Sequence, residues 1–143
     1  MTNALTNIQI NEMMKNNKLF RGVFCKDQLK TNCRKNGYYI INLENSNQSG
    51  SHWCAFFKKE NYFLYFDSFG QPPAKEVIEI IPKNSLYLRN NRIIQDWKSS
   101  ACGYFCIGFC TFVKDEKSFK WFISQFSSMT QLNDTILANL LLS

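Results

Sequence analysis

The sequence predicts an α+β fold in which a mainly antiparallel sheet of about four or five strands packs against one buried helix. The 143 residues are 45% hydrophobic and 20% charged, a balance that favours a packed core over a disordered chain. Short aromatic and β-branched stretches alternate with polar turns, which is typical of strands. Residues 101–113 are apolar almost all round, as expected of a helix enclosed by protein. The length fits a single domain covering residues 1–143.

Most of the predicted sheet lies in the amino-terminal half. Residues 4–16 predict a first helix, because apolar side chains recur among polar ones at helical spacing. Strands are expected at residues 20–25, 38–43, 53–57 and 62–67. The last two strands are joined by residues 58–61 alone and therefore predict a hairpin. Residues 45–50, Asn-Ser-Asn-Gln-Ser-Gly, predict a polar turn.

The carboxyl-terminal half predicts more helix than strand. Residues 69–73, Phe-Gly-Gln-Pro-Pro, break the chain, and a short helix is expected at 74–81, before Pro82. Residues 86–88 predict a short extended segment, and residues 92–95 predict a further strand. Helices are expected at residues 101–113, 118–127 and 129–142.

The chain is basic, with 17 Lys and Arg against 11 Asp and Glu and a net charge of +6. Much of the excess lies between residues 15 and 35, where seven cations face only Asp27. Such a surface attracts polyanions, which include nucleic acid, an acidic partner and an anionic membrane. It also serves as an ordinary solvated face that keeps a protein in solution. Charge alone does not decide between these interpretations.

The six cysteines do not predict disulfides or structural zinc. The amino terminus lacks the basic and apolar pattern of a secretory signal, so we expect a reducing compartment and free thiols. Cys102, Cys106 and Cys110 are spaced by four, and the chain has neither a Cys-x-x-Cys pair nor a second histidine, so no metal site is expected. The longest apolar run, residues 101–113, is shorter than the roughly 20 residues that span a bilayer.

Two residues at the ends of the predicted hairpin are candidates for chemistry. His52, the only histidine, begins the first strand, and Asp67 ends the second. Antiparallel pairing would bring them together across the ladder. A carboxylate on one ring nitrogen fixes the imidazole tautomer and leaves the other nitrogen free to act on a nucleophile. Each also has a structural interpretation, His52 as an incidental edge residue and Asp67 as a turn residue.

Cys102 and Gln95 complete a possible set for thiol chemistry. Cys102 begins the predicted buried helix, where unpaired N–H groups and the positive dipole end favour a thiolate. Gln95, at the end of a predicted strand, would aim its amide at an oxygen that gains charge during thiolate attack on a carbonyl. Cys102 alone is equally compatible with a small buried core residue. Together, the four residues form the parts of a thiol acyl-transfer site.

The spacing of these residues resembles that of a known family, the adenovirus-type (adenain-like) cysteine proteases, which also occur in virophages, Maverick/Polinton elements and other double-stranded DNA viruses. The similarity spans residues 18–113 and rests on Gly50, His52-Trp53, Ala55-Phe56, Asp67, Phe69-Gly70, Gln95, Ser100-Ala101-Cys102-Gly103 and Phe105-Cys106. Asp67 stands where the adenovirus enzymes usually have Glu. No cysteine lies between Asp67 and Gln95, where the adenovirus enzyme binds its activating peptide through a disulfide, so that activation mode is not expected here.

The resemblance implies a viral maturation endopeptidase that cleaves capsid or core precursor proteins, often after Gly or another small residue. Cys102 would be the nucleophile, His52 the general base and acid, and Asp67 the residue that orients His52. Gln95 and the Cys102 N–H would form the oxyanion hole, and no cofactor would be required for the chemistry. We expect a monomer, located in the virion and in the cytoplasm or nucleus of the infected cell, with no membrane partner.

The adenovirus relatives use viral DNA as a cofactor, so the resemblance also implies double-stranded DNA as a polyanion that enhances activity. We expect Lys30, Arg34 and Lys35 to contact it. Two alternatives remain at this point: a protease of ubiquitin-like modifiers, and a non-catalytic, basic DNA-binding protein on the same fold.

Overall fold

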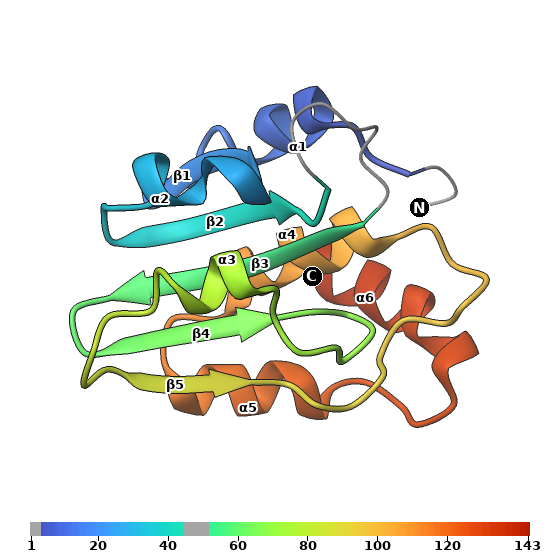
Figure 1. Cartoon of the computed structure of the whole chain (residues 1–143). Coiled ribbons are helices and arrows are strands. Elements are labelled where there is room, and N and C mark those ends of the chain that lie inside the picture. The colour runs from blue at the N-terminus through green and yellow to red at the C-terminus, as the bar shows by residue number, and fades with distance from the viewer. Residues whose placement is uncertain (1–3, 45–51) are drawn as a thin grey trace.

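The computed structural model describes residues 4–44 and 52–143, and its centre is a five-stranded sheet in the order β1-β2-β3-β4-β5 (Figure 1). The strands are β1 (Phe20–Cys25), β2 (Gly37–Asn42), β3 (Trp53–Lys59), β4 (Tyr62–Phe66) and β5 (Leu86–Arg89). The four predicted strands are therefore confirmed, and the extended segment at 86–88 is the fifth strand. The polar turn expected at residues 45–50 lies outside the described residues.

The sheet mixes antiparallel and parallel pairing. Strands β2, β3 and β4 pair antiparallel, whereas the edge strands β1 and β5 pair parallel to β2 and β4. The predicted antiparallel pairing is thus confirmed for β2, β3 and β4, whereas the two edge strands pair in parallel. A parallel pair needs a crossover connection. The β1–β2 crossover contains η1 (Lys26–Gln28) and α2 (Leu29–Asn32), which the sequence pattern did not predict, and the β4–β5 crossover contains α3 (Lys75–Ile78), expected at 74–81.

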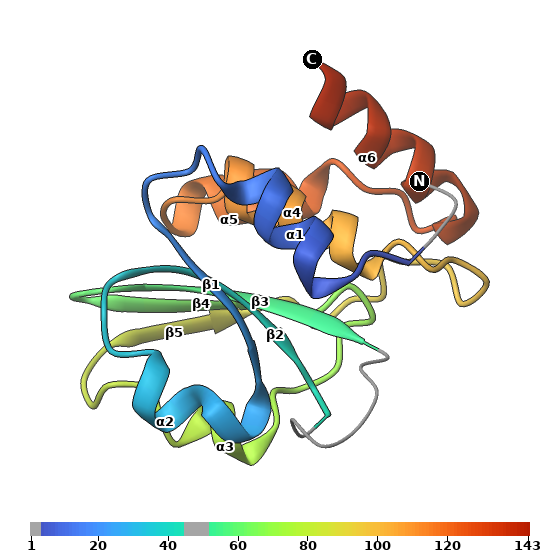
Figure 2. The same cartoon turned by 90° about the horizontal axis from the view of Figure 1, so that it is seen from above.

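Helices cover both faces of the sheet (Figure 2). On one face lie α1 (Asn7–Met14), α4 (Cys102–Phe112), α5 (Glu116–Ser124) and α6 (Asn133–Leu142), the last preceded by η2 (Thr130–Leu132). The shorter helices α2 and α3 lie on the opposite face. Because both faces are covered, all six residues of β2 are buried, and the central strands have apolar residues on both sides.

Helix α4 is the buried helix that the apolar run predicts. It packs mainly on β3, and the Phe109 ring stacks on Phe66 of β4 with centroids 5.6 Å apart. Phe119 of α5 meets Phe109 edge-on, so aromatic rings connect the sheet, α4 and α5. No helix in the described ranges is both long and apolar enough to cross a membrane. The core therefore fixes α4, and with it the position of Cys102, against the centre of the sheet.

Residues 92–95 do not form the strand that their sequence predicts. The backbone N–H groups of Ile94 and Gln95 both donate to the carbonyl oxygen of Ser68, at 2.8 and 2.9 Å, an arrangement that a β-ladder does not have. Gly70 has a φ of 69°, and a Cβ there would lie 2.8 Å from the backbone of Arg92. The segment is therefore a loop packed against the turn that follows β4, and this contact brings Gln95 next to Ser68.

Candidate active site

His52 and Asp67 lie together at one end of the β3–β4 hairpin. His52 immediately precedes β3, and Asp67 immediately follows β4. Ala55 pairs with Phe66 in the ladder. The same register, continued beyond the strand ends, places His52 and Asp67 at the same end of the hairpin. The Nε2 atom of His52 is 2.9 Å from Oδ1 of Asp67. Strand pairing therefore produces an imidazole–carboxylate pair from residues 15 positions apart.

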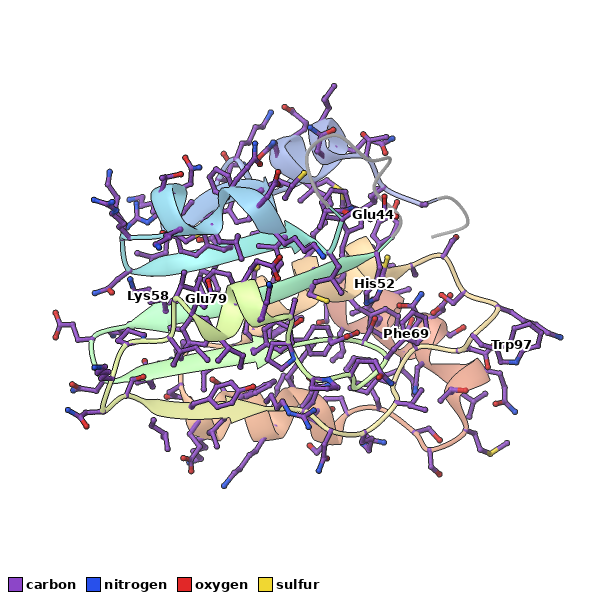
Figure 3. The ribbon with its side chains drawn as sticks, in the orientation of Figure 1. Glu44, His52, Lys58, Phe69, Glu79 and Trp97 are labelled. Atoms are coloured by element: carbon purple, nitrogen blue, oxygen red, sulfur yellow. The ribbon has the colours of Figure 1, made fainter. Side chains whose placement is uncertain are left out.

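The Asp67 carboxylate is held in place by further hydrogen bonds. Its Oδ1 also accepts from the backbone N–H of Phe69 at 2.9 Å. The Asn90 side chain accepts from the Asp67 N–H at 3.1 Å and donates to the Asp67 carbonyl at 2.6 Å. The Phe69 ring lies beside the His52 ring, with centroids 5.1 Å apart (Figure 3). Asp67 is 1% exposed and can orient His52 from a fixed position.

Cys102 meets the same imidazole from the other side of the site. It is the first residue of α4, is 7% exposed and lies close enough to His52 to raise the pKa of the ring. Ala101 provides no side-chain cap, so the positive end of the helix dipole is next to the thiol. The structure thus brings the three predicted triad residues together, with His52 between Asp67 and Cys102.

Gly103 allows close packing beside the nucleophile. A Cβ at this position would lie 3.1 Å from Cβ of Leu5 and 3.4 Å from Cδ1 of Trp53. The Trp53 indole N–H donates to the Leu5 carbonyl at 3.1 Å. The space beside Gly103 is therefore occupied by Leu5 and Trp53 of the same chain.

The electrostatics of His52 favour its protonated form. Burial lowers the pKa of His52, but hydrogen bonds with Asp67, Cys102 and Cys54 have the larger combined effect and raise the pKa well above its usual value. The ring then carries a proton at neutral pH, between the Asp67 carboxylate and the sulfur atoms of Cys102 and Cys54. An imidazolium in this position can deliver a proton to a leaving group.

Gln95 is buried in the loop before α4. It is 1% exposed, and its Oε1 accepts from the Ser68 hydroxyl at 2.6 Å. Its Nε2 donates to the carbonyl of Ser99 at 2.9 Å and approaches the Ser99 hydroxyl at 3.3 Å. The side chain thus connects the turn after β4 to the segment that leads into α4. Its amide is fixed near the start of that helix.

Several supporting residues escaped the sequence analysis. Ser99 donates to the Asp134 carboxylate of α6 at 2.8 Å and accepts from the Ala101 N–H at 3.1 Å, which anchors the entry to α4. Asn90 anchors Asp67. Because Asn and Ser are common turn residues, neither Asn90 nor Ser99 is distinguished in the sequence as an anchor of the site.

A third residue, Cys54 of β3, lies in the same cluster. It is fully buried and hydrogen-bonds with His52. One ligand atom from each of His52, Cys54 and Asp67 lies within 4.8 Å of the other two. Side chains two positions apart on a strand point to the same face, which explains why His52 and Cys54 are neighbours.

Lys30, Arg34 and Lys35 lie away from this cluster. Lys30 belongs to α2, and Arg34 and Lys35 follow that helix. All three are exposed, and α2 lies on the sheet face opposite α4 (Figure 2). Lys58 donates to the Arg34 carbonyl at 3.0 Å and adds a nearby cation. The structure therefore separates the predicted DNA-contacting residues from the catalytic candidates.

We expect the His52 ring to remain protonated from about pH 6 to about pH 8, because its pKa is raised. Since the chain has one histidine, the ring nitrogen resonances of the labelled protein report on His52 alone. Replacing Asp67 with Asn should move the titration toward lower pH by removing a charged acceptor. A wild-type ring that titrates near its ordinary value would contradict the electrostatic argument.

Comparisons with known proteins identify the fold. No protein-family profile matches the chain, and no curated protein sequence is significantly similar to it. Two crystal structures of the ASFV pS273R protease align with it at TM-scores of 0.60 and 0.59, with 16% and 17% identity, covering 93% of this chain and 67% of the other. The SUMO protease Ulp1 aligns with a TM-score of 0.35 and 18% identity over 73% of this chain and 54% of its own, too weakly to support an argument. The chain thus shares the α+β fold of a viral protease.

Proposed function

We propose that the chain is a cysteine protease with Cys102 as the nucleophile. The observation that carries this proposal is the position of the His52 imidazole, which is 2.9 Å from the Asp67 carboxylate and lies beside Cys102 at the start of α4. Thiol-dependent acyl transfer requires a nucleophile, a group that carries its proton and an acid that orients this group, all in contact. The shared fold with the ASFV pS273R protease supports the same conclusion.

The reaction proceeds in two acyl-transfer steps. With its proton on His52, the Cys102 sulfur attacks the scissile carbonyl and forms a tetrahedral intermediate. His52 then donates the proton to the departing amine, the C–N bond breaks, and a thioester remains on Cys102. A water molecule attacks the thioester while His52 takes its proton. The C–S bond breaks, the carboxylic acid leaves, and the proton on His52 restores the starting pair.

The oxyanion of each intermediate requires donors that are already in place. We assign this role to the backbone N–H of Cys102 and the side-chain amide of Gln95. Support comes from the burial of Gln95 and from the hydrogen bonds to Ser68 and Ser99 that hold its amide near the start of α4. A donor held in place before the reaction needs little reorganisation when charge develops, and the Gln95 amide would exchange its longer contact, 3.3 Å to the Ser99 hydroxyl, for the oxyanion.

For the biological role, we propose maturation of viral capsid or core precursors by cleavage after small residues, often Gly, in the virion or the infected cell. The adenain-like motif around His52, Asp67, Gln95 and Cys102 supports this role, as does the fold shared with a viral protease. We propose that the enzyme acts as a monomer, since the three triad residues come from one chain.

The nucleophile can be tested with a matched pair of variants on α4. Cys102→Ala should abolish cleavage of a proteome-derived peptide pool, whereas Cys106→Ala, one turn further along the helix, should retain it. Burial raises the pKa of the Cys106 thiol, and that side chain is fully buried, so it should not react. Mass spectrometry of new termini measures cleavage and reads the residue before the cut.

Other outcomes would favour the alternatives. Cleavage by the Cys102→Ala protein would exclude Cys102 as the nucleophile. Cleavage of ubiquitin-like modifier precursors without cleavage of capsid precursors would favour a modifier protease. A folded protein that binds DNA but cleaves neither class would favour the non-catalytic alternative.

The oxyanion role of Gln95 predicts a selective loss of turnover. Gln95→Ala should lower kcat by about 10²–10³ and change KM little, because the donor acts on charge that develops during the reaction. Ser68→Ala is the matched control, since it removes the hydrogen bond to Oε1 and keeps the amide donor. Its effect on kcat should be smaller. Unchanged turnover in Gln95→Ala would remove this residue from the oxyanion hole.

We further propose that double-stranded DNA binds the exposed cations Lys30, Arg34 and Lys35 and enhances activity. Binding through phosphates should weaken with salt by about 0.9 log units per log unit of salt for each contact. Changing the three cations to Gln should flatten this dependence, measured by fluorescence anisotropy, while cleavage of a short peptide persists. The control replaces the exposed Lys114, Lys117 and Lys120 around α5 and should leave the slope unchanged. Equal slopes for both triple variants would refute this DNA surface.

A further inference from the structure

Cys54 is a buried thiol that the proposed mechanism does not use. It is fully buried on β3 and hydrogen-bonds with His52. Burial raises the pKa of Cys54, although the contact with His52 opposes this effect. The sulfur also belongs to the cluster in which ligand atoms of His52, Cys54 and Asp67 are all within 4.8 Å of one another. Three different ligand types thus converge at the end of the hairpin.

The hydroxyl of Tyr65 supplies a second, independent observation at this cluster. Tyr65 lies on β4 and is fully buried, yet its hydroxyl oxygen has no hydrogen-bond partner of good geometry among the described residues. The group that it faces is the Cys54 thiol. A buried donor left unsatisfied is costly. A thiolate at Cys54 would accept from it, and this donor partly offsets the burial that raises the pKa of Cys54.

We propose that His52, Cys54 and Asp67 form a binding site for Zn²⁺. An imidazole nitrogen, a thiolate sulfur and a carboxylate oxygen are its usual ligands, and spacings below 4.8 Å are close to those between ligands around one such ion. The ion displaces the proton between His52 and Asp67 and the thiol proton of Cys54. One thiolate and one carboxylate then balance its two positive charges, which permits burial. The Tyr65 hydroxyl donates to the bound sulfur.

Metal binding at this site opposes the proposed catalysis, and this part of the inference depends on the proposed function. The ion engages His52 and Asp67, so the imidazole can no longer carry a proton to and from Cys102. Zn²⁺ therefore acts as a reversible inhibitor whose site includes a thiol other than the nucleophile. The fourth position is open to water.

The spacing of Cys and His along the sequence predicts no metal site, because zinc motifs are recognised by ligands that are close in the chain. Here the ligands are close through strand pairing. His52 and Cys54 occupy alternate positions beside and on β3, and Asp67 follows the neighbouring strand. A lone histidine with one residue between it and a cysteine carries no metal signal until the hairpin partner is known.

The binding test uses Co²⁺ as a spectroscopic substitute for Zn²⁺ in the folded Cys102→Ala protein, which keeps the proposed ligands and lacks the nucleophile. We expect thiolate-to-cobalt absorption in the near ultraviolet, with visible bands of tetrahedral cobalt, and displacement of both by Zn²⁺. Adding Cys54→Ala should abolish the signal. Tyr65→Phe should weaken affinity by about 10-fold or more. Cys106→Ala, which removes an equally buried thiol, should leave the signal unchanged.

A cobalt signal that survives the loss of Cys54, or no signal in the folded Cys102→Ala protein, would overturn the site. In cleavage assays, with inhibition expressed relative to the rate of each protein without metal, Cys54→Ala should need at least about 10-fold more Zn²⁺ for half-inhibition. Equal sensitivity would instead place inhibition at Cys102 and His52 and refute the regulatory role. Because the cobalt signal needs no catalysis, a protein without protease activity still decides whether the metal site exists.

Discussion

The hydrogen bond between His52 and Asp67 depends on the pairing of β3 with β4, and the rest of the site is arranged around it. A shift of one residue in this register would send His52 to the opposite face of the sheet from Asp67. The buried aromatic residues of the hairpin oppose such a shift, because Phe56, Phe63 and Phe66 would exchange their core environments. The core that stabilises the sheet therefore also determines the chemistry at its edge.

Local sequence patterns predicted the parts of the fold whose partners are close in the chain. The hairpin needed only residues 53–67, and α4 was evident because its apolar residues cover the whole helix surface. The same reasoning failed at residues 92–95, where Ile93 and Ile94 favour a strand but the backbone donors bind the Ser68 carbonyl. The parallel pairing of the edge strands β1 and β5 could not be predicted either. The crossover helices α2 and α3 that such pairing requires span only four residues each and give little sequence signal.

In the candidate site, too, only the features that depend on local sequence could be predicted. His52, Asp67, Gln95 and Cys102 could be proposed from residue type and position along their elements. The residues that hold them could not, since Asn90 reaches Asp67 from 23 positions away and Asp134 reaches Ser99 from 35. Ordinary turn and helix residues acquire these roles only when the fold brings them together. Support for a catalytic group is thus a property of the topology, and a single sequence does not display it.

The contact of Leu5 with Gly103 has a consequence for the order of events during synthesis. Leu5 is synthesised well before its partners Trp53 and Gly103, and before the Asp134 that anchors Ser99. The entrance to α4 therefore cannot reach its final packing until most of the chain has been translated. Closing a contact between such distant residues is also slow, because a long loop must be ordered first. Until the segment around Asp134 has been synthesised, a nascent chain therefore carries Cys102 in an unfinished setting.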